Sequence, residues 1–378
     1  MPTRKKHSKL SKSSKLLKLS QLFKPSKPSK TTKASRQSPK ARKGKKSAPT
    51  SPARRLARIA AAAIVAVLAA LCVGGDFYVH HSPEWLADRR SFFTAPLEWF
   101  GDRTAFMTDA LGWTGHDCVY ETDDPVPEGQ VLFAGAPVRI GAPAPSDLVT
   151  LDRGSFQIGW SPSLRHPVWA AYHVPREARF DNGKRPSFQR DRSVDSSPSP
   201  ADYTNTHYDR GHMVPNRAIV TRFGPDLQKK TFQMTNIAPQ RPGLNRGPWR
   251  EMEQRIADLW TQKYGEIWVV VGAIPNSSTR EKLANSAVSV PEKFFMVAVA
   301  QTSDGVRALA VLLEQGAKRG DFPVHNIVTI DELEKLSGLE FFPDMPKFIK
   351  KPLKSDRPTR LWPVRFRDLV KLILIRFT

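Results

Sequence analysis

The chain has 378 residues, which is long enough for two domains, and it carries 59 Lys and Arg against 36 Asp and Glu, a formal net charge of +23. Residues 1–58 hold 20 of the basic residues and no acidic one, so the remainder has 39 basic against 36 acidic residues and a net charge of only +3. Two cysteines exclude a disulfide scaffold and a Cys-rich zinc module, and the composition excludes collagen, coiled coils and a wholly disordered chain.

The N-terminal region has two contrasting parts. Residues 1–55 are rich in Lys, Ser, Pro and Thr, and we predict a disordered tail because such a segment buries too little apolar surface to fold. Residues 59–75 then give 17 residues without a charge, close to the lower limit for a membrane-spanning helix. We therefore expect a transmembrane signal anchor over residues 56–79. The basic excess precedes it, which predicts a cytoplasmic N-terminus and an exported (periplasmic or extracellular) remainder.

Other interpretations of this segment stay open. An organellar, mitochondrial, location is the main alternative, because the segment is rich in Ser and free of acidic residues, although it is rich in Lys rather than Arg. A cleaved signal peptide is disfavoured by the long basic region. The large Leu71 before Cys72 counts against a lipoprotein signal, and the flanking polycation counts against a buried core helix.

The elements predicted after this segment are those of an α+β domain. Residues 80–127 are expected to form a connector with one or two short helices, and residues 128–346 to form the domain itself. Strands are predicted at 156–160, 168–174, 266–274, 293–300 and 306–314, the last two as a hairpin with Asp304 and Gly305 in the turn. Apolar spacing predicts one helix from Pro248 to Gly265 and another over 331–338, with Thr329 as its cap and Gly338 as its stop.

The residues that carry chemistry lie in YDRGHMVPNR (208–217), MTNIAPQ (234–240) and LNRGPWREME (244–253). His212 lies in a compact polar turn, where a neutral imidazole could act as a general base. Asn245 and Glu253 are eight residues apart, about two helical turns, and can point to one side of a helix. An amide oxygen and a carboxylate suit Mg²⁺.

Together with nearby arginines, a base and a hard-cation site supply what metal-assisted phosphodiester hydrolysis requires. Each element alone is a weak signal: a single loop histidine is more often structural, and a single helix glutamate is usually a solvated residue. A zinc pair of His207 and His212 is disfavoured, since no third ligand stands near it in the sequence. The combination, in this order, is what indicates hydrolysis.

The sequence closely resembles the DNA/RNA non-specific endonuclease family, which includes the secreted Serratia nuclease and mitochondrial endonuclease G. The resemblance lies in three motifs and their order: DRGH, then N-I-x-P-Q, then L-N-x-x-x-W-x-x-x-E. The resemblance covers roughly residues 128–346 and implies a ββα-metal fold with a central antiparallel sheet. It implies that His212 is the general base and that Asn245 directly binds one Mg²⁺, with Mn²⁺ as an alternative ion. It further implies that Glu253 orients the metal-bound waters.

The resemblance also carries over to supporting residues. Asp209 and Arg210 match the motif, with Arg210 near the scissile phosphate, and Asn236 would support the site through its amide. Family members commonly have an arginine four residues after the metal-site glutamate, and here that position is Ala257. Arg255, two residues after Glu253, points about 200° around an α-helix.

The candidate phosphate-binding residues are Arg255 and an upstream arginine, Arg185, for which Arg190 is an alternative.

The function implied is a Mg²⁺-dependent, sugar-non-specific endonuclease with DNA and RNA as substrates. The alternative is a catalytically weak, nuclease-like nucleic-acid-binding or scaffolding protein at the membrane, which only Ala257 favours. Residues 347–378 are expected to form a basic amphipathic extension that either lies on a membrane surface or packs back on the domain. The oligomeric state is left open, with a homodimer among the alternatives.

Overall fold

The computed structural model describes residues 106, 108, 110–121, 130–276, 281–284 and 286–377. The predicted tail (1–55) and anchor (56–79) lie outside these residues, as does most of the predicted connector. Among the residues that are described, no helix is both long and apolar enough to cross a membrane.

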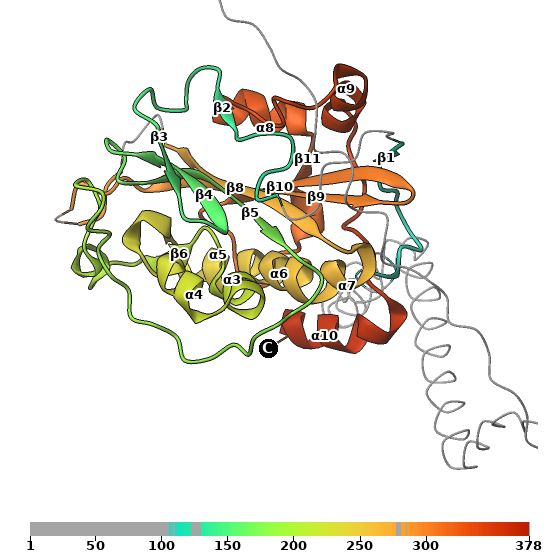
Figure 1. Ribbon diagram of the computed structural model, residues 1–378, viewed down its shortest axis with the longest axis horizontal. Coiled ribbons are helices and arrows are strands. Elements are labelled where there is room, and N and C mark those ends of the chain that lie inside the picture. The colour runs from blue at the N-terminus through green and yellow to red at the C-terminus, as the bar shows by residue number, and fades with distance from the viewer. Residues whose placement is uncertain are drawn as a thin grey trace, which may run out of the picture. The chain divides into compact units, whose positions relative to one another are not determined.

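A large antiparallel sheet forms the centre of the fold, as predicted (Figure 1). In spatial order its strands are β1 (Val119–Tyr120), β10 (Gly305–Glu314), β9 (Pro291–Thr302), β8 (Ile267–Pro275), β5 (His166–Val174), β4 (Phe156–Ser161) and β3 (Val149–Asp152), and β11 (Ile327–Val328) pairs with β10. The five predicted strands are confirmed as β4, β5, β8, β9 and β10. One detail differs: Thr302 pairs with Gly305, so the β9–β10 turn consists of Ser303 and Asp304.

Helices cover both faces of the sheet (Figure 1). One face carries α8 (Ile330–Ser337), α9 (Lys347–Ser355) and a small sheet of β2 (Val138–Arg139) and β12 (Leu339–Glu340). The other carries α3 (Asn216–Phe223), α4 (Pro225–Thr231), α5 (Pro242–Arg246), α6 (Pro248–Gln254) and α7 (Thr261–Tyr264). Side chains alternate along a strand, so Tyr172 packs in the core below α6, whereas Trp169 packs in the core beneath α8.

The predicted helix from Pro248 to Gly265 is confirmed, with an irregular middle. It runs through α6, a π-helical stretch, η4 (Arg255–Trp260), and α7, and it ends at Gly265. The helix predicted over 331–338 is also confirmed as α8. Thr329 caps it through Glu332, and Gly338 ends it in the left-handed conformation.

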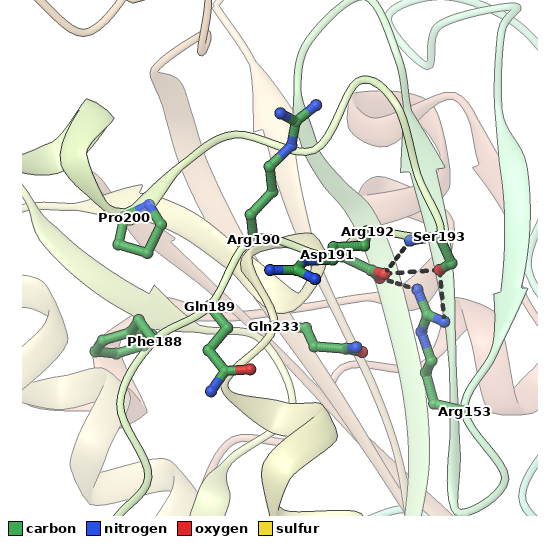
Figure 2. A pocket seen from close by; sticks show the side chains of 9 residues that line it. All are labelled: Arg153, Phe188, Gln189, Arg190, Asp191, Arg192, Ser193, Pro200 and Gln233. Carbon is green, nitrogen blue, oxygen red and sulfur yellow. Dashed lines mark hydrogen bonds and ion pairs between the residues drawn. The ribbon is translucent and has the colours of Figure 1, made fainter.

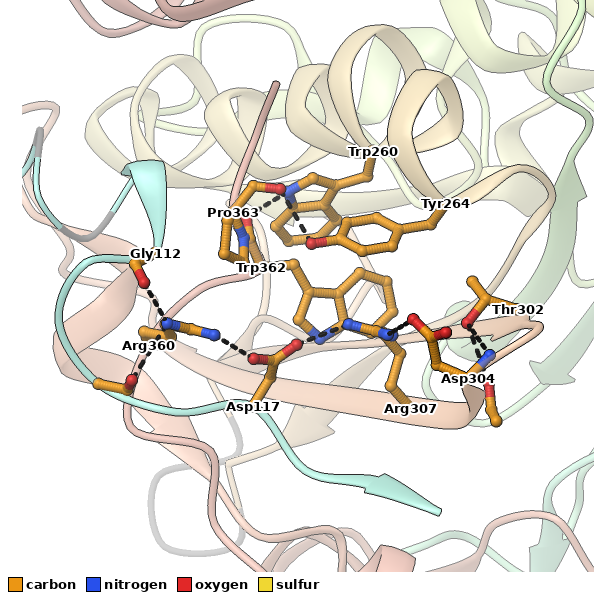
Figure 3. Close-up of polar contacts among 12 residues, drawn as sticks. Gly112, Asp117, Trp260, Tyr264, Thr302, Asp304, Arg307, Arg360, Trp362 and Pro363 are labelled. Carbon is orange, nitrogen blue, oxygen red and sulfur yellow. Dashed lines mark hydrogen bonds and ion pairs between the residues drawn. The ribbon is translucent and has the colours of Figure 1, made fainter. Parts of the chain in front are cut away.

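The C-terminal segment packs back on the domain, the second of its two expected arrangements. Trp362 is fully buried, with its ring 5.0 Å from that of Trp260 and 5.4 Å from that of Tyr264. Asp117, from the described end of the predicted connector, pairs with Arg307 on β10 and with Arg360 (Figure 3). These contacts join the two ends of the described chain to the sheet.

Helix α10 (Leu369–Phe377) continues this packing on one side only. Leu372 is fully buried in the core, while Phe366, just before the helix, and Val370 are 77% and 66% exposed. The extension therefore belongs to the folded domain and also presents apolar side chains to solvent.

Candidate active site

The DRGH motif forms β6 (Asp209–His212), which pairs with β7 (Ile237–Gln240) in a separate two-stranded sheet. In this pairing Gly211 lies opposite Ala238, and the side chain of Gln240 crosses over it. A Cβ atom at Gly211 would lie 2.1 Å from the Gln240 Oε1 atom, far inside contact distance. Glycine is therefore required before His212 for steric reasons.

His212 packs against two aromatic rings that also contact each other. Its imidazole centroid is 5.2 Å from the ring of Phe188 and 4.8 Å from that of Phe232. Burial, followed by the nearby charge of Arg185, lowers the pKa of His212 to about 3, so the ring is neutral at physiological pH. Its Nε2 atom is buried and has no hydrogen-bond partner among the described residues. A neutral imidazole with an unused nitrogen can accept a proton.

Asn236 lies behind the histidine and does not line the cleft. It is fully buried, and its Oδ1 accepts a hydrogen bond of 2.9 Å from the backbone N–H of Val214. Its Nδ2 donates to the carbonyl oxygens of Val214 and Thr231, each at 2.9 Å. Asn236 therefore holds the backbone just after His212, which makes it a positioning residue.

Helix α5 carries Asn245, whose orientation is fixed by Asp209. The Nδ2 of Asn245 donates to the Asp209 Oδ2 atom at 2.9 Å, and Arg246 binds both oxygens of the same carboxylate at 2.6 and 2.8 Å. Because the amide nitrogen is used in this way, the Asn245 Oδ1 atom is left for another partner. Asp209 itself acts through Asn245 and Arg246.

Glu253 lies on α6, the helix predicted from Pro248, and Asn245 precedes it on the separate short helix α5. Gly247 separates α5 from α6, and a Cβ there would lie 2.4 Å from the Gly243 carbonyl oxygen. The Trp249 indole donates to Glu253 Oε1 at 2.9 Å. Burial raises the pKa of Glu253 to about 8, although the Trp249 hydrogen bond and the charges of Arg185 and Arg250 oppose the rise.

A cleft of about 430 Å³ brings the principal predicted residues together. His212, Asn245 and Glu253 all line it, and so do Arg185 and Arg210. Arg210 donates to the Pro200 carbonyl oxygen at 2.8 and 3.2 Å, which fixes its guanidinium at the rim.

Arg255 was wrongly predicted to bind phosphate. It is 1% exposed and forms a buried ion pair of 2.8 Å with Glu251, one turn earlier on the helix. Its guanidinium lies over the Phe106 ring, and it lines a different cavity of about 220 Å³. The 200° offset from Glu253 directs Arg255 into the core, away from the cleft.

Four arginines that the sequence did not single out also line the cleft: Arg217, Arg246, Arg250 and Arg319. Arg250 lies three residues before Glu253, so helical spacing could have identified it as a cleft residue. Arg319 comes from the loop after β10, and no local pattern indicates its place. Ala257 lines the cleft too, so this position faces the site even though it carries no charge.

The residues of the cleft fit a hard divalent cation. Asn245 offers a neutral oxygen whose amide nitrogen is already bonded. Glu253 is a carboxyl group whose pKa is raised by burial, so a cation bound beside it would favour its charged form. Among the described residues no three His, Cys, Asp or Glu side chains cluster as a metal site.

The chain is similar to known nucleases. The family model for DNA/RNA non-specific endonucleases matches residues 134–348. Endonuclease G, mitochondrial, of Bos taurus is 28% identical over 239 residues, which cover 56% of this chain and 79% of that protein.

Nuclease EXOG, mitochondrial, of Xenopus laevis is also 28% identical, over 215 residues that cover 50% of this chain and 57% of that protein. A solved complex of EndoG with EndoGI aligns with a TM-score of 0.49 and 22% identity, over 60% of this chain and 95% of that one. The family match spans more than half of the chain and includes every residue of the cleft, and the chain therefore belongs to the DNA/RNA non-specific endonuclease family.

Proposed function

We propose that this protein is a metal-dependent endonuclease that hydrolyses phosphodiester bonds of both DNA and RNA. The observation that carries the proposal is the meeting of His212, Asn245 and Glu253 in one cleft lined by arginines. A histidine base, hard oxygen ligands and guanidinium groups together match the needs of phosphodiester hydrolysis.

His212 would take the proton of the attacking water. In the free cleft its pKa is low, because of burial and the charge of Arg185. A bound phosphate brings negative charge beside both groups, which raises the imidazole pKa toward the range where a general base is effective. Phe188 and Phe232 restrict the ring, so its orientation is set before the substrate arrives.

The arginines would hold the phosphate oxygens. Arg250 lies on the same helix as Glu253, lines the cleft, and forms no ion pair with any described carboxylate. It is the best replacement for the charge that Ala257 lacks, and Arg185 and Arg210 add two more guanidinium groups. Contacts to phosphate carry no base information, so we expect little sequence selectivity.

Asn245 and Glu253 would hold the metal ion, Mg²⁺ or alternatively Mn²⁺, with Asp209 keeping the Asn245 oxygen turned toward it. When bound, such an ion stabilises the charge that develops on the leaving oxygen. The two paired strands β6 and β7 come before the helices α5 and α6, which carry Asn245 and Glu253. This order of strands, helix and metal donors is the one expected of a ββα-metal nuclease.

The alternative function is a catalytically weak, nucleic-acid-binding or scaffolding protein. Ala257 favours this alternative, because the arginine that is common four residues after the metal-site glutamate is missing. The other arginines lining the cleft favour the enzyme instead.

We keep the predicted organisation of the whole chain as part of the proposal: a Lys-rich tail (1–55), a membrane anchor (56–79), a connector (80–127), the nuclease domain (128–346) and the extension (347–378). The anchor would bind the membrane and place the domain on the exported side. The mitochondrial relatives support the organellar location instead. The location of a reporter fused after Thr378 distinguishes the exported from the organellar location.

The test of activity is an assay of the full chain on supercoiled plasmid, single-stranded DNA and RNA, in Mg²⁺, in Mn²⁺ and in EDTA. We expect all three substrates to be degraded with a divalent ion and none in EDTA. Tight binding without cleavage under every condition would instead establish the scaffolding alternative.

A further inference from the structure

A second pocket, larger than the cleft around His212, has Phe188 and Arg190 among its lining residues (Figure 2). Its volume is about 860 Å³, and Phe188 is one of its walls. The same phenylalanine ring lies 5.2 Å from the ring of His212, and the guanidinium of Arg210 lies 5.6 Å from its centroid. Since His212 and Arg210 both line the cleft, Phe188 is the partition between the two cavities.

One side of this pocket is rigid and balanced in charge. Arg153 forms an ion pair with Asp191, which is 1% exposed (Figure 2). Asp191 also accepts hydrogen bonds from Ser193 and Thr235, at 2.6 and 2.7 Å. Burial alone would raise the pKa of Asp191, but these hydrogen bonds and the charge of Arg153 hold it below its usual value. The pair therefore adds structure and no net charge.

The remaining charge of the pocket is positive and uncompensated. Arg190 and Arg192 are exposed, and neither forms an ion pair with a described carboxylate. Arg190 donates one hydrogen bond of 2.8 Å to the Asp195 carbonyl oxygen, which orients the side chain without neutralising it. Two unpaired guanidinium groups beside a rigid wall can bind phosphate groups.

We infer that this pocket binds the unpaired strand next to the cleaved phosphodiester, with its phosphates on Arg190 and Arg192 and a base against Phe188. The inference rests on the proposed nuclease function. Bases follow each other at about 3.4 Å along a strand, so a pocket one ring away from His212 holds nucleotides about one to three positions from the cut.

The ligand class follows from the shape of the site. An aromatic wall together with arginines is the arrangement that binds single strands without sequence preference, since every base can stack on a ring. A concave pocket of this size admits a splayed nucleotide, whereas a base in a duplex remains stacked in its helix. This pocket therefore binds single-stranded or locally opened nucleic acid.

The test measures binding of a 12-nucleotide single strand by the full chain in EDTA, where no metal-dependent cleavage interferes, over a series of salt concentrations. For single strands the slope of log K against log salt is about −0.7 per neutralised phosphate, so Arg190→Ala/Arg192→Ala should make the slope shallower by about 1.4. Arg190→Lys/Arg192→Lys keeps both charges and should keep most of the slope.

The matched control is Lys347→Ala/Lys351→Ala, which removes two exposed charges from α9 on the opposite face of the sheet. Its slope should equal that of the unmodified chain. The basic N-terminal residues are the same in every variant and give each the same background binding, so each variant is compared with the unmodified chain.

A second readout locates the strand directly. With 5-iodouracil placed at successive positions of the oligonucleotide, we expect photochemical cross-links to the peptide that contains Phe188.

Two results overturn the inference: an unchanged salt slope in the Arg190→Ala/Arg192→Ala variant, or cross-links that avoid the Phe188 peptide. Failure of the proposed function has a different signature, which is absence of metal-dependent cleavage by the unmodified chain. Since the binding test is carried out in EDTA, the two failures are distinguished.

Discussion

Burial sets the charge of the cleft. It lowers the pKa of His212 to about 3 and raises that of Glu253 to about 8, so in the free protein both groups are largely uncharged near neutral pH. Arginines line the cleft around these two groups, and the cleft is therefore positive before anything binds. A positive cleft concentrates polyanions, which suits a substrate recognised through its phosphates.

Asp209 provides a test of how Asn245 is oriented. In Asp209→Asn the acceptor for the Asn245 amide and for Arg246 is weakened, so the metal-facing oxygen is no longer fixed. Loss of such a supporting partner typically costs about 10- to 100-fold in metal affinity or activity. We expect the Mg²⁺ concentration for half-maximal cleavage to rise and the rate to recover at high Mg²⁺.

Asp226→Asn is the control for this prediction, because Asp226 is exposed and pairs only with Lys229 on α4. An Asp209→Asn enzyme with an unaltered Mg²⁺ requirement would show that Asp209 does not act through Asn245.

The spacing of compact motifs was enough to predict which of the candidate site residues lie together. His212, Asn245 and Glu253 lie in short segments of strongly biased spacing, and all three line one cleft. Arg255 was misplaced because its direction depends on packing: it pairs with Glu251 and lies against Phe106, which is distant in sequence. Arg319 could not be found at all, since only the folded chain brings its loop to the cleft.

At the scale of elements, the helical segment from α6 to α7 has two distinct faces. Arg250 and Glu253 line the cleft, while Glu251 and Arg255 form a buried ion pair on the other side. The π-helical η4 begins at Arg255 and contains Ala257, which also lines the cleft. Such π-helical turns are rare and frequently occur at functional sites.

The two arginines of this segment should therefore behave oppositely when replaced. Arg255→Ala leaves Glu251 buried without its ion-pair partner, and breaking a buried pair costs about 3–5 kcal/mol of stability. Arg250→Ala removes the phosphate contact proposed for this residue and should cost about 2–4 kcal/mol of transition-state stabilisation with little change in stability.

Thermal unfolding and kcat/KM of both variants check this pair of expectations. An Arg250→Ala protein with full activity would exclude Arg250 as the replacement for the charge missing at Ala257.

The elements themselves were largely predictable, because their signals are local. Apolar and β-branched runs gave the five long strands, and Thr329 and Gly338 gave both ends of α8. The start of α6 at Pro248 was predicted, but the short helix α5 before it was not, because its end depends on a close approach: the Gly247 Cα position faces the Gly243 carbonyl and the backbone of Arg319. Spacing alone does not reveal a contact of this kind.

At the scale of the whole molecule, the fold extends beyond the segment that resembles the family. The family match ends at residue 348, yet Trp362 and Leu372 are fully buried in the main core. Asp117, Arg307 and Arg360 join the described end of the connector, the sheet and the C-terminal segment in one ionic network (Figure 3). The C-terminal extension is thus a structural part of the domain.

Trp362→Ala should accordingly destabilise the protein by about 3–5 kcal/mol, as expected for removing a large buried aromatic side chain. Trp113→Ala is the matched control, because Trp113 is 71% exposed and surface replacements usually change stability by less than about 0.5 kcal/mol. Denaturant unfolding of the two variants measures the difference. Equal stabilities would mean that the extension is dispensable for the fold.

The central claim, that the cleft around His212 catalyses phosphodiester hydrolysis, is tested most directly by the initial rate of plasmid nicking in Mg²⁺ by the unmodified full chain and by His212→Ala. A general base contributes about 10²- to 10⁴-fold, so we predict a rate lower by at least two orders of magnitude at an unchanged unfolding temperature. A folded His212→Ala protein that nicks the plasmid at the unmodified rate would contradict the account.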